Sequence, residues 1–164
     1  MRNLRISQTA IEPNHGCRDN IFEYPQNLEN ALSLIQQAVS GEKEDIDYYN
    51  YLIDIAPSEE DKQIISSIRN DEMKHYNMFI QIYCDITGHP VPQGIEEPFI
   101  APPTYCDGLK TAIFGENTAI MEYPQILYAM QPRVHINMLT GIISDEIRHG
   151  ILLNYLYSKN NCNA

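Results

Sequence analysis

Residues 71–75 read Asp-Glu-Met-Lys-His, and residues 145–149 read Asp-Glu-Ile-Arg-His. Each stretch lies inside a long segment in which apolar residues recur every three or four positions, the pattern of an amphipathic helix. Residues three apart on a helix lie about 60° apart around its axis, so the glutamate and the histidine of each stretch face the same way. Both face the apolar side, where a charged group needs a partner.

The two stretches belong to an internal repeat with an offset of 74 residues. Gly41-Glu42 matches Gly115-Glu116, and Tyr49 matches Tyr123 at the same offset. Matches at so many chemically specific positions predict two equivalent halves of the molecule.

The apolar pattern predicts four helices, over about 27–55, 59–87, 107–131 and 132–158. Ser58 with Asp61 resembles a capping box at the start of the second helix, and Asp107 is expected to cap the third. Pro124 is expected to kink or widen the third helix, and Pro132 fits the first turn of the fourth.

The lengths of the connections predict the topology. Helices one and two are joined tightly, as are helices three and four, so each pair is expected to be an antiparallel hairpin. Residues 88–104 are rich in Pro and Gly and can span about 55 Å, more than the roughly 40 Å length of one helix. The sequence therefore predicts an all-α four-helix bundle over residues 27–164, with one long crossover and an N-terminal extension over residues 1–26.

Six polar residues fall on the inner faces of these helices. Two helices each contribute a Glu-x-x-His pair and two each contribute one glutamate, which is the ligand set of a two-metal carboxylate site. Four unpartnered carboxylates would be very costly to bury, whereas two divalent cations would neutralise them. The predicted metal ligands are Glu42, Glu72, His75, Glu116, Glu146 and His149. Oxygen and nitrogen ligands suit iron or manganese, and zinc is an alternative.

Further residues lie near this set. Tyr49 and Tyr123 follow the lone glutamates by two turns, so each is predicted either to hydrogen-bond a ligand carboxylate of the other half or to be a core tyrosine. Asp71 and Asp145 either orient the histidines across the bundle or lie on a solvated flank.

Other polar residues are expected to take no part in the site. Glu44 and Glu122 should face elsewhere on their helices, and His135 suits a cap or surface role.

Composition narrows the classes of function. The formal net charge of −11 argues against nucleic-acid binding, and no apolar segment approaches the roughly 20 residues that a membrane helix needs. No signal-peptide pattern precedes the helices, so a cytoplasmic location is expected. The four cysteines are far apart without a Cys-x-x-Cys pair, and four reduced thiols are expected: Cys17, Cys84, Cys106 and Cys162.

The motifs around the glutamates and histidines give the chain a family resemblance. Gly41-Glu42, Asp71-Glu72-Met73-Lys74-His75, Gly115-Glu116 and Asp145-Glu146-Ile147-Arg148-His149 resemble the rubrerythrin-like branch of the ferritin superfamily. More narrowly, residues 56–60 and 67–72 look like small bacterial ferritin-like proteins. The resemblance covers about residues 27–158. It implies a ferritin-like bundle with a non-haem di-iron centre that reacts with peroxide or oxygen.

The chain differs from rubrerythrins in two respects. It has no rubredoxin-type cysteine pattern, and Ala119 stands where rubrerythrins carry an additional glutamate.

Three functions follow from this interpretation. The first is an oxidoreductase that reacts Fe(II) with peroxide or oxygen, of ferroxidase or peroxidase type, with electrons from iron or from a separate donor protein. The second is a structural or iron-handling protein in which the metals staple the bundle. The third is a dimanganese catalase-like enzyme with the same ligands. A homodimer is one assembly that the interpretation leaves open.

Overall fold

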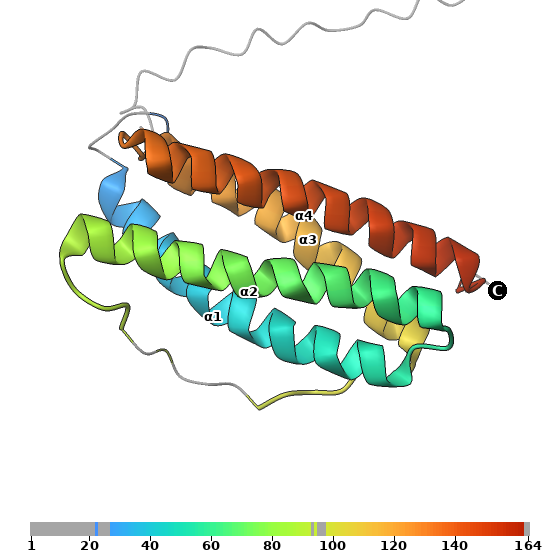
Figure 1. Ribbon diagram of the computed structural model, residues 1–164. Helices are drawn as coiled ribbons and strands as arrows, with labels where there is room; N and C mark the ends of the chain where they lie inside the picture. The colour runs from blue at the N-terminus through green and yellow to red at the C-terminus, as the bar shows by residue number, and fades with distance from the viewer. Residues whose placement is uncertain (1–21, 23–26, 93, 95–97, 163–164) are drawn as a thin grey trace, which may run out of the picture.

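The computed structural model describes Phe22, residues 27–92, Gly94 and residues 98–162 (Figure 1). Within these residues the chain forms four helices and no strand: α1 (Leu28–Ile55), α2 (Glu59–Thr87), α3 (Tyr105–Tyr128) and α4 (Arg133–Lys159). The expected all-α four-helix bundle is confirmed. Most of the expected N-terminal extension lies outside the described residues.

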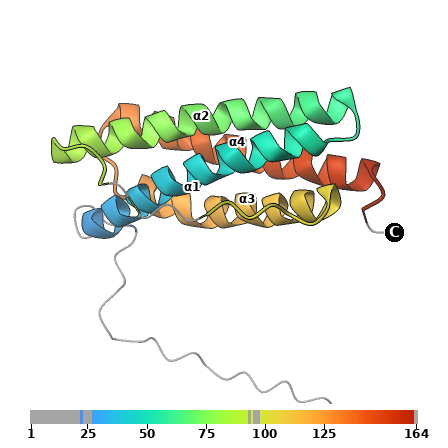
Figure 2. The same ribbon diagram turned by 90° about the horizontal axis from the view of Figure 1, so that it is seen from below.

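The helices pack as two hairpins. α1 packs against α2 and α3 against α4, while α1 also contacts α3 and α2 contacts α4. The connection between α2 and α3 carries the chain from one end of the bundle to the other (Figures 1 and 2). Two antiparallel hairpins joined by one long crossover were predicted, and this topology is confirmed.

Local signals set both ends of α2. The Ser58 hydroxyl accepts a hydrogen bond from the Asp61 N–H at 3.2 Å, as the predicted capping box requires. α2 ends at Gly88, whose φ of 69° is the left-handed conformation that glycine adopts most easily.

The expected cap of α3 was wrong. Thr104, not Asp107, caps this helix, because the Thr104 hydroxyl accepts a hydrogen bond from the Asp107 N–H at 3.1 Å. The helix therefore begins earlier than expected, and it ends earlier too, at Tyr128. α3 runs through Pro124 without a break, and Pro132 is the N-cap of α4 rather than part of its first turn.

The core consists of two apolar clusters, one towards each end of the bundle. One is built around Ile35, Phe79, Ile126 and Leu139, and the other around Leu52, Ile65, Leu109 and Leu153. Along every helix the predicted metal ligands lie between the residues of the two clusters. The fold thus places a polar layer at mid-height, with apolar packing above and below it.

One close approach between helices depends on a glycine. A Cβ added to Gly108 of α3 would clash with the Leu52 side chain of α1 and lie 3.1 Å from Pro102. The Tyr48 hydroxyl of α1 also donates a hydrogen bond to the Gly108 carbonyl at 3.2 Å. Gly108 therefore sets how closely the two hairpins pack at this end.

The expectation of four reduced cysteines was wrong for one pair. Cys106 at the start of α3 and Cys162 just after α4 form a disulfide, with their Cα atoms 5.3 Å apart. Fifty-six residues separate them in sequence, but the antiparallel hairpin brings the first turn of α3 next to the end of α4. Cys84 is a free thiol, and Cys17 lies outside the described residues.

Candidate metal centre

The bundle brings the six predicted ligands together in its polar layer. α1 supplies Glu42, α3 supplies Glu116, and α2 and α4 each supply a Glu-x-x-His pair. Each of the six side chains is at most 6% exposed. A charged group with so little contact with water requires compensation from its neighbours.

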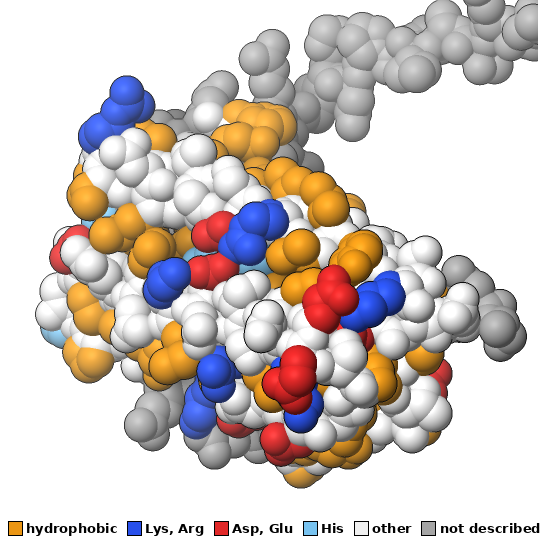
Figure 3. Space-filling model, turned by 45° about the vertical axis from the view of Figure 1, so that its right-hand side comes forward, with side chains coloured by type: hydrophobic (Ala, Val, Ile, Leu, Met, Phe, Trp, Pro, Cys, Tyr) orange, Lys and Arg blue, Asp and Glu red, His pale blue; other side chains and the backbone are white. Residues whose placement is uncertain are grey.

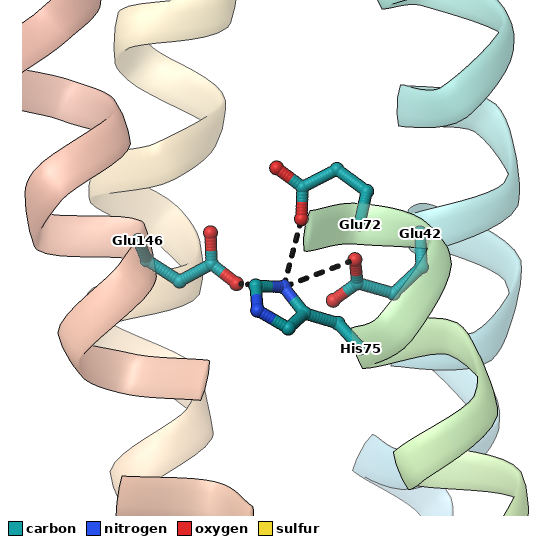
Figure 4. A group of neighbouring side chains, drawn as sticks. All are labelled: Glu42, Glu72, His75 and Glu146. Atoms are coloured by element: carbon teal, nitrogen blue, oxygen red, sulfur yellow. Dashed lines mark hydrogen bonds and ion pairs between the residues drawn. The ribbon is translucent and has the colours of Figure 1, made fainter. Parts of the chain in front are cut away.

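Each histidine directs Nδ1 at three carboxylates. His75 Nδ1 lies 2.8 Å from Glu72 Oε2, 3.1 Å from Glu146 Oε1 and 3.8 Å from Glu42 Oε2 (Figure 4). The three glutamates come from three different helices and converge on one ring nitrogen. This first group therefore ties α1, α2 and α4 together.

The second group repeats this geometry in the other half. His149 Nδ1 lies 2.9 Å from Glu72 Oε1, 3.2 Å from Glu146 Oε2 and 3.7 Å from Glu116 Oε2. Glu72 and Glu146 belong to both groups, and each presents one oxygen to either histidine. The two groups are thus neighbours with two shared carboxylates.

The donor atoms of the two groups fit divalent cations. Within each group of four residues, one ligand atom per residue lies within 4.8 Å of all the others. Three buried carboxylate oxygens accept no hydrogen bond from any residue that the structure describes: Glu42 Oε2, Glu72 Oε1 and Glu146 Oε1. Oxygen atoms left without donors in a dry interior are suited to a cation, and four carboxylates with two imidazoles match iron, manganese or zinc. The clusters could therefore hold metal ions, with Glu72 and Glu146 shared.

Burial controls the protonation of the two outer glutamates. Burial, together with the charges of Glu72 and Glu146, raises the pKa of Glu42 well above its ordinary value. Burial likewise raises the pKa of Glu116 to about 9. Carboxylates crowded in a dry core favour their protonated forms, and this argument applies to these two residues.

The pKa of Glu146 shifts in the opposite direction. Burial favours its neutral form, but close contacts with His149 and His75 outweigh burial and lower the pKa of Glu146 to about 2. Burial also favours neutral histidines, yet contacts with Glu146 and Glu72 raise the pKa of His75 to about 10. Contacts with Glu116, Glu146 and Glu72 raise the pKa of His149 to about 12. Without metal the histidines therefore carry protons that bound cations would displace.

The two tyrosines make reciprocal contacts across the bundle. The Tyr123 hydroxyl donates a hydrogen bond to Glu42 Oε1 at 2.8 Å, and the Tyr49 hydroxyl donates one to Glu116 Oε1. Each tyrosine thus reaches the lone glutamate of the other half, which was one of the two predicted roles. These contacts fix one oxygen of each outer carboxylate and leave the other facing the histidines.

Asp71 and Asp145 lie on the outer side of the histidines. His75 Nε2 is 3.4 Å from Asp145 Oδ2, and His149 Nε2 is 3.5 Å from Asp71 Oδ2, so each aspartate reaches the histidine of the other helix. Arg148 donates hydrogen bonds to both aspartates. This face shows acidic and basic side chains side by side, with histidine atoms visible among them (Figure 3). Of the two predicted positions, orientation across the bundle is the observed one.

The expected cap or surface role of His135 was wrong. His135 is 3% exposed, and its Nε2 lies 2.9 Å from Asp85 Oδ2 of α2. At the other end of the bundle, buried Asp61 of α2 accepts hydrogen bonds from Lys159 of α4 and from Asn160 at 2.5 and 2.6 Å. The 74-residue offset relates Asp61 to His135 and Asp85 to Lys159, so the repeat itself was the signal that could have revealed both pairs.

The remaining candidates behave as expected. Glu44 is exposed and Glu122 half-buried, and neither belongs to the groups that could hold a metal ion. Among the described residues, no helix combines the length and the apolar character that crossing a membrane requires.

Comparison with known proteins places the chain beside one bacterial relative. No protein-family model matches it, and no solved structure matches it. The chain is 30% identical over 122 residues to the uncharacterized protein YhjR of Bacillus subtilis (strain 168), a match that covers 74% of this chain and 82% of that protein. At this identity and coverage, the chain belongs to the same family as YhjR.

Proposed function

We propose that this protein is a non-haem di-iron carboxylate protein of the rubrerythrin-like branch of the ferritin superfamily, and that it reacts Fe(II) with peroxide or oxygen. The observation that carries the proposal is the pair of buried groups with shared Glu72 and Glu146. Glu42 and His75 would complete one metal position, and Glu116 and His149 the other.

The surrounding residues prepare these ligands. Asp145 and Asp71 lie 3.4 and 3.5 Å from Nε2 of His75 and His149, on the side of each ring away from Nδ1, and each Nδ1 is directed at the carboxylates. Tyr123 and Tyr49 hold the outer glutamates by one oxygen each. The two apolar clusters exclude water from above and below. A constellation held this way needs little rearrangement when metal binds.

The proposed reduction of peroxide balances in electrons and protons. With Fe(II) held by Glu42, Glu72, His75, Glu116, Glu146 and His149, the site would supply the two electrons that, with two protons, convert one hydrogen peroxide into two molecules of water. Continuous turnover then needs an external reductant, and we propose a separate electron-donor protein, because the chain has no rubredoxin-type cysteine pattern. The expected cytoplasmic location stays a prediction. The Cys106–Cys162 disulfide is a type of bond more common in oxidising compartments.

Metal loading tests the proposal directly. Protein loaded with Fe(II) without oxygen should retain two equivalents per chain after desalting. Addition of peroxide should then produce the near-ultraviolet absorbance of ferric iron. The double variant Glu42→Gln with Glu116→Gln should retain less iron and give a smaller absorbance change. Its matched control, Glu44→Gln with Glu122→Gln, should behave as the wild type.

The outcomes separate the candidate functions. Protein that binds no divalent metal, or a double variant that binds as much as the wild type, would contradict the six-residue site. Two bound iron ions oxidised once, without turnover when a reductant is present, would favour the iron-handling or structural role. Disproportionation of peroxide only by manganese-loaded protein would favour the catalase-like enzyme.

A further inference from the structure

Along most of its length, the outer face of the α3/α4 hairpin carries no charge at its exposed positions. These positions are uncharged between Thr111 and Tyr128 in α3 and between Val134 and Ser158 in α4. The partly exposed Asp145 and Arg148 of α4 are turned towards α2, and exposed Asp107 and Lys110 bound the uncharged stretch at the start of α3. Several large apolar side chains lie on this surface: Phe114 is 63% exposed, Met121 75%, Ile147 47% and Ile151 65%. An uncharged surface that is two helices wide is unusual on a chain whose formal net charge is −11.

The internal repeat supplies a built-in comparison. The α1/α2 positions that correspond to Phe114, Met121 and Ile151 hold Ser40, Asp47 and Asn77. The charged residues Lys43, Glu44 and Asp54 likewise correspond to Asn117, Thr118 and Tyr128. The same helical architecture is therefore polar and charged on one outer face and apolar and neutral on the other, so the helix geometry does not require the apolar residues.

Helical spacing gathers these residues into one surface. Phe114, Met121 and Tyr128 are seven residues apart, which places them along one side of α3. Ile147, Ile151 and Tyr155 are four residues apart, which places them along one side of α4. α3 and α4 pack together as an antiparallel hairpin, so the two stripes run side by side.

We propose that this face is the interface through which two copies of the chain form a two-fold symmetric dimer. A strongly acidic chain repels its own copies, and the repulsion is weakest where neither surface carries charge. A two-fold axis pairs each surface with itself, which a self-complementary apolar face satisfies.

The area of the face is large enough for a second copy of the chain to bind there. A strip two helices wide and as long as the uncharged part of α3, residues 111–128, covers about 540 Å² per copy, taking about 10 Å per helix diameter and 1.5 Å of rise per residue. Two such strips bury about 1,100 Å² in total, and specific protein interfaces bury at least about 1,000 Å². The face is thus large enough for a specific dimer, and it is separate from the buried metal ligands.

Mass measurement at several concentrations tests the dimer. Sedimentation equilibrium of the full-length protein at micromolar concentration should give twice the chain mass of 18.8 kDa. The variant Ile151→Asp with Met121→Asp should sediment as a monomer. Both positions are more than half exposed, so helix content and thermal melting should confirm that the variant remains folded.

The repeat also provides the control. Asn77→Asp introduces the same residue as Ile151→Asp at the equivalent position of the other half, and it should leave the dimer intact. A wild-type protein that is monomeric throughout the concentration range would overturn the proposal. A dimer that survives the double variant, or that Asn77→Asp dissociates, would overturn it too, because the contact would then lie on another face.

Discussion

The two halves of this molecule are alike where they face each other and different where they face outwards. In the interior, the same residue types recur 74 residues later, and the contacts between the halves are reciprocal. The recurring residues are Glu42, Tyr49, Asp71, Glu72 and His75. On the outside, Asp47 of α1 corresponds to Met121 of α3. At the two ends of the bundle, buried Asp61 corresponds to buried His135. A metal site made by both halves constrains them equally, whereas their outer surfaces and the two ends of the bundle have separate roles.

The largest expected effect concerns the equivalence of the two metal positions. Saturation with Fe(II) or Mn(II) at a hundredfold excess over Kd should stabilise the folded protein by about 2.7 kcal/mol for each independent site. Glu42→Gln and Glu116→Gln should each reduce this gain by a similar amount, because the two glutamates occupy equivalent positions. Thermal melts with and without metal measure the gain. If one variant loses all of it and the other none, the two halves are not equivalent.

A smaller effect distinguishes the two ends of the bundle. Asp61 is fully buried and bonded to Lys159, Ser58, Asn160 and Tyr105, so Asp61→Asn should cost about 1–3 kcal/mol. Asp85, the carboxylate at the other end, is 45% exposed, so Asp85→Asn should cost about 1 kcal/mol or less. Urea unfolding at pH 7 compares the two variants. Equal losses would contradict the difference inferred from burial.

The Asp61 contribution should also depend on pH. Burial alone would raise its pKa, but the hydrogen bonds from Lys159, Ser58, Asn160 and Tyr105 outweigh burial and lower the pKa from 3.8 to about 2. A carboxyl group with a lowered folded pKa stabilises the protein fully above its unfolded pKa. That stabilisation is lost as the pH falls from about 4 to about 2. The stability difference between wild type and Asp61→Asn should therefore shrink over this range. A constant difference would mean that the charge of Asp61 is not what stabilises the fold.

The smallest expected effect compares the tyrosines. Tyr49→Phe and Tyr123→Phe each remove one hydrogen bond to an outer glutamate, and each should destabilise the protein by about 1 kcal/mol. Because the two contacts are reciprocal, the two losses should agree within experimental error. Denaturant titrations of both variants provide the measurement, and Tyr51→Phe, a half-buried tyrosine of α1, serves as the control. A loss confined to one tyrosine would show that the halves differ even in the interior.

The sequence allowed the bundle and the polar layer to be predicted because both rest on regular patterns. Apolar periodicity located all four helices, and the length of the 88–104 connection fixed the topology. Glu72 and His75 face inwards for the same reason that Ile68 and Phe79 do, namely their spacing on α2. The equivalence of the two halves also predicts that a two-fold rotation superposes residues 28–87 on residues 102–161.

Other contacts could not be predicted, because they join residues that are distant in sequence and carry no local signal. Cys106 and Cys162 have no motif around them and become neighbours only once α3 and α4 pack. The end of α3 depended on which residues bond the last carbonyl groups, and periodicity does not determine this. His135 likewise carries no local signal of its burial, because its partner Asp85 lies 50 positions earlier on another helix.

The Cys106–Cys162 disulfide also gives the two halves different mechanical behaviour. It closes residues 106–162 into a covalent ring that contains Glu116, Glu146 and His149, whereas the corresponding positions of the first half are Leu32 and Gly88. Pulling on the ends of the unfolded chain extends the segment before Cys106 but does not extend the ring. The extended chain is therefore shorter by about 190 Å, at 3.4 Å per residue, than it would be without the disulfide. An unfolding enzyme that translocates the protein from its N-terminus would therefore first take in a single extended polypeptide. At Cys106 it would reach the disulfide-closed loop, where two segments of the polypeptide must pass side by side.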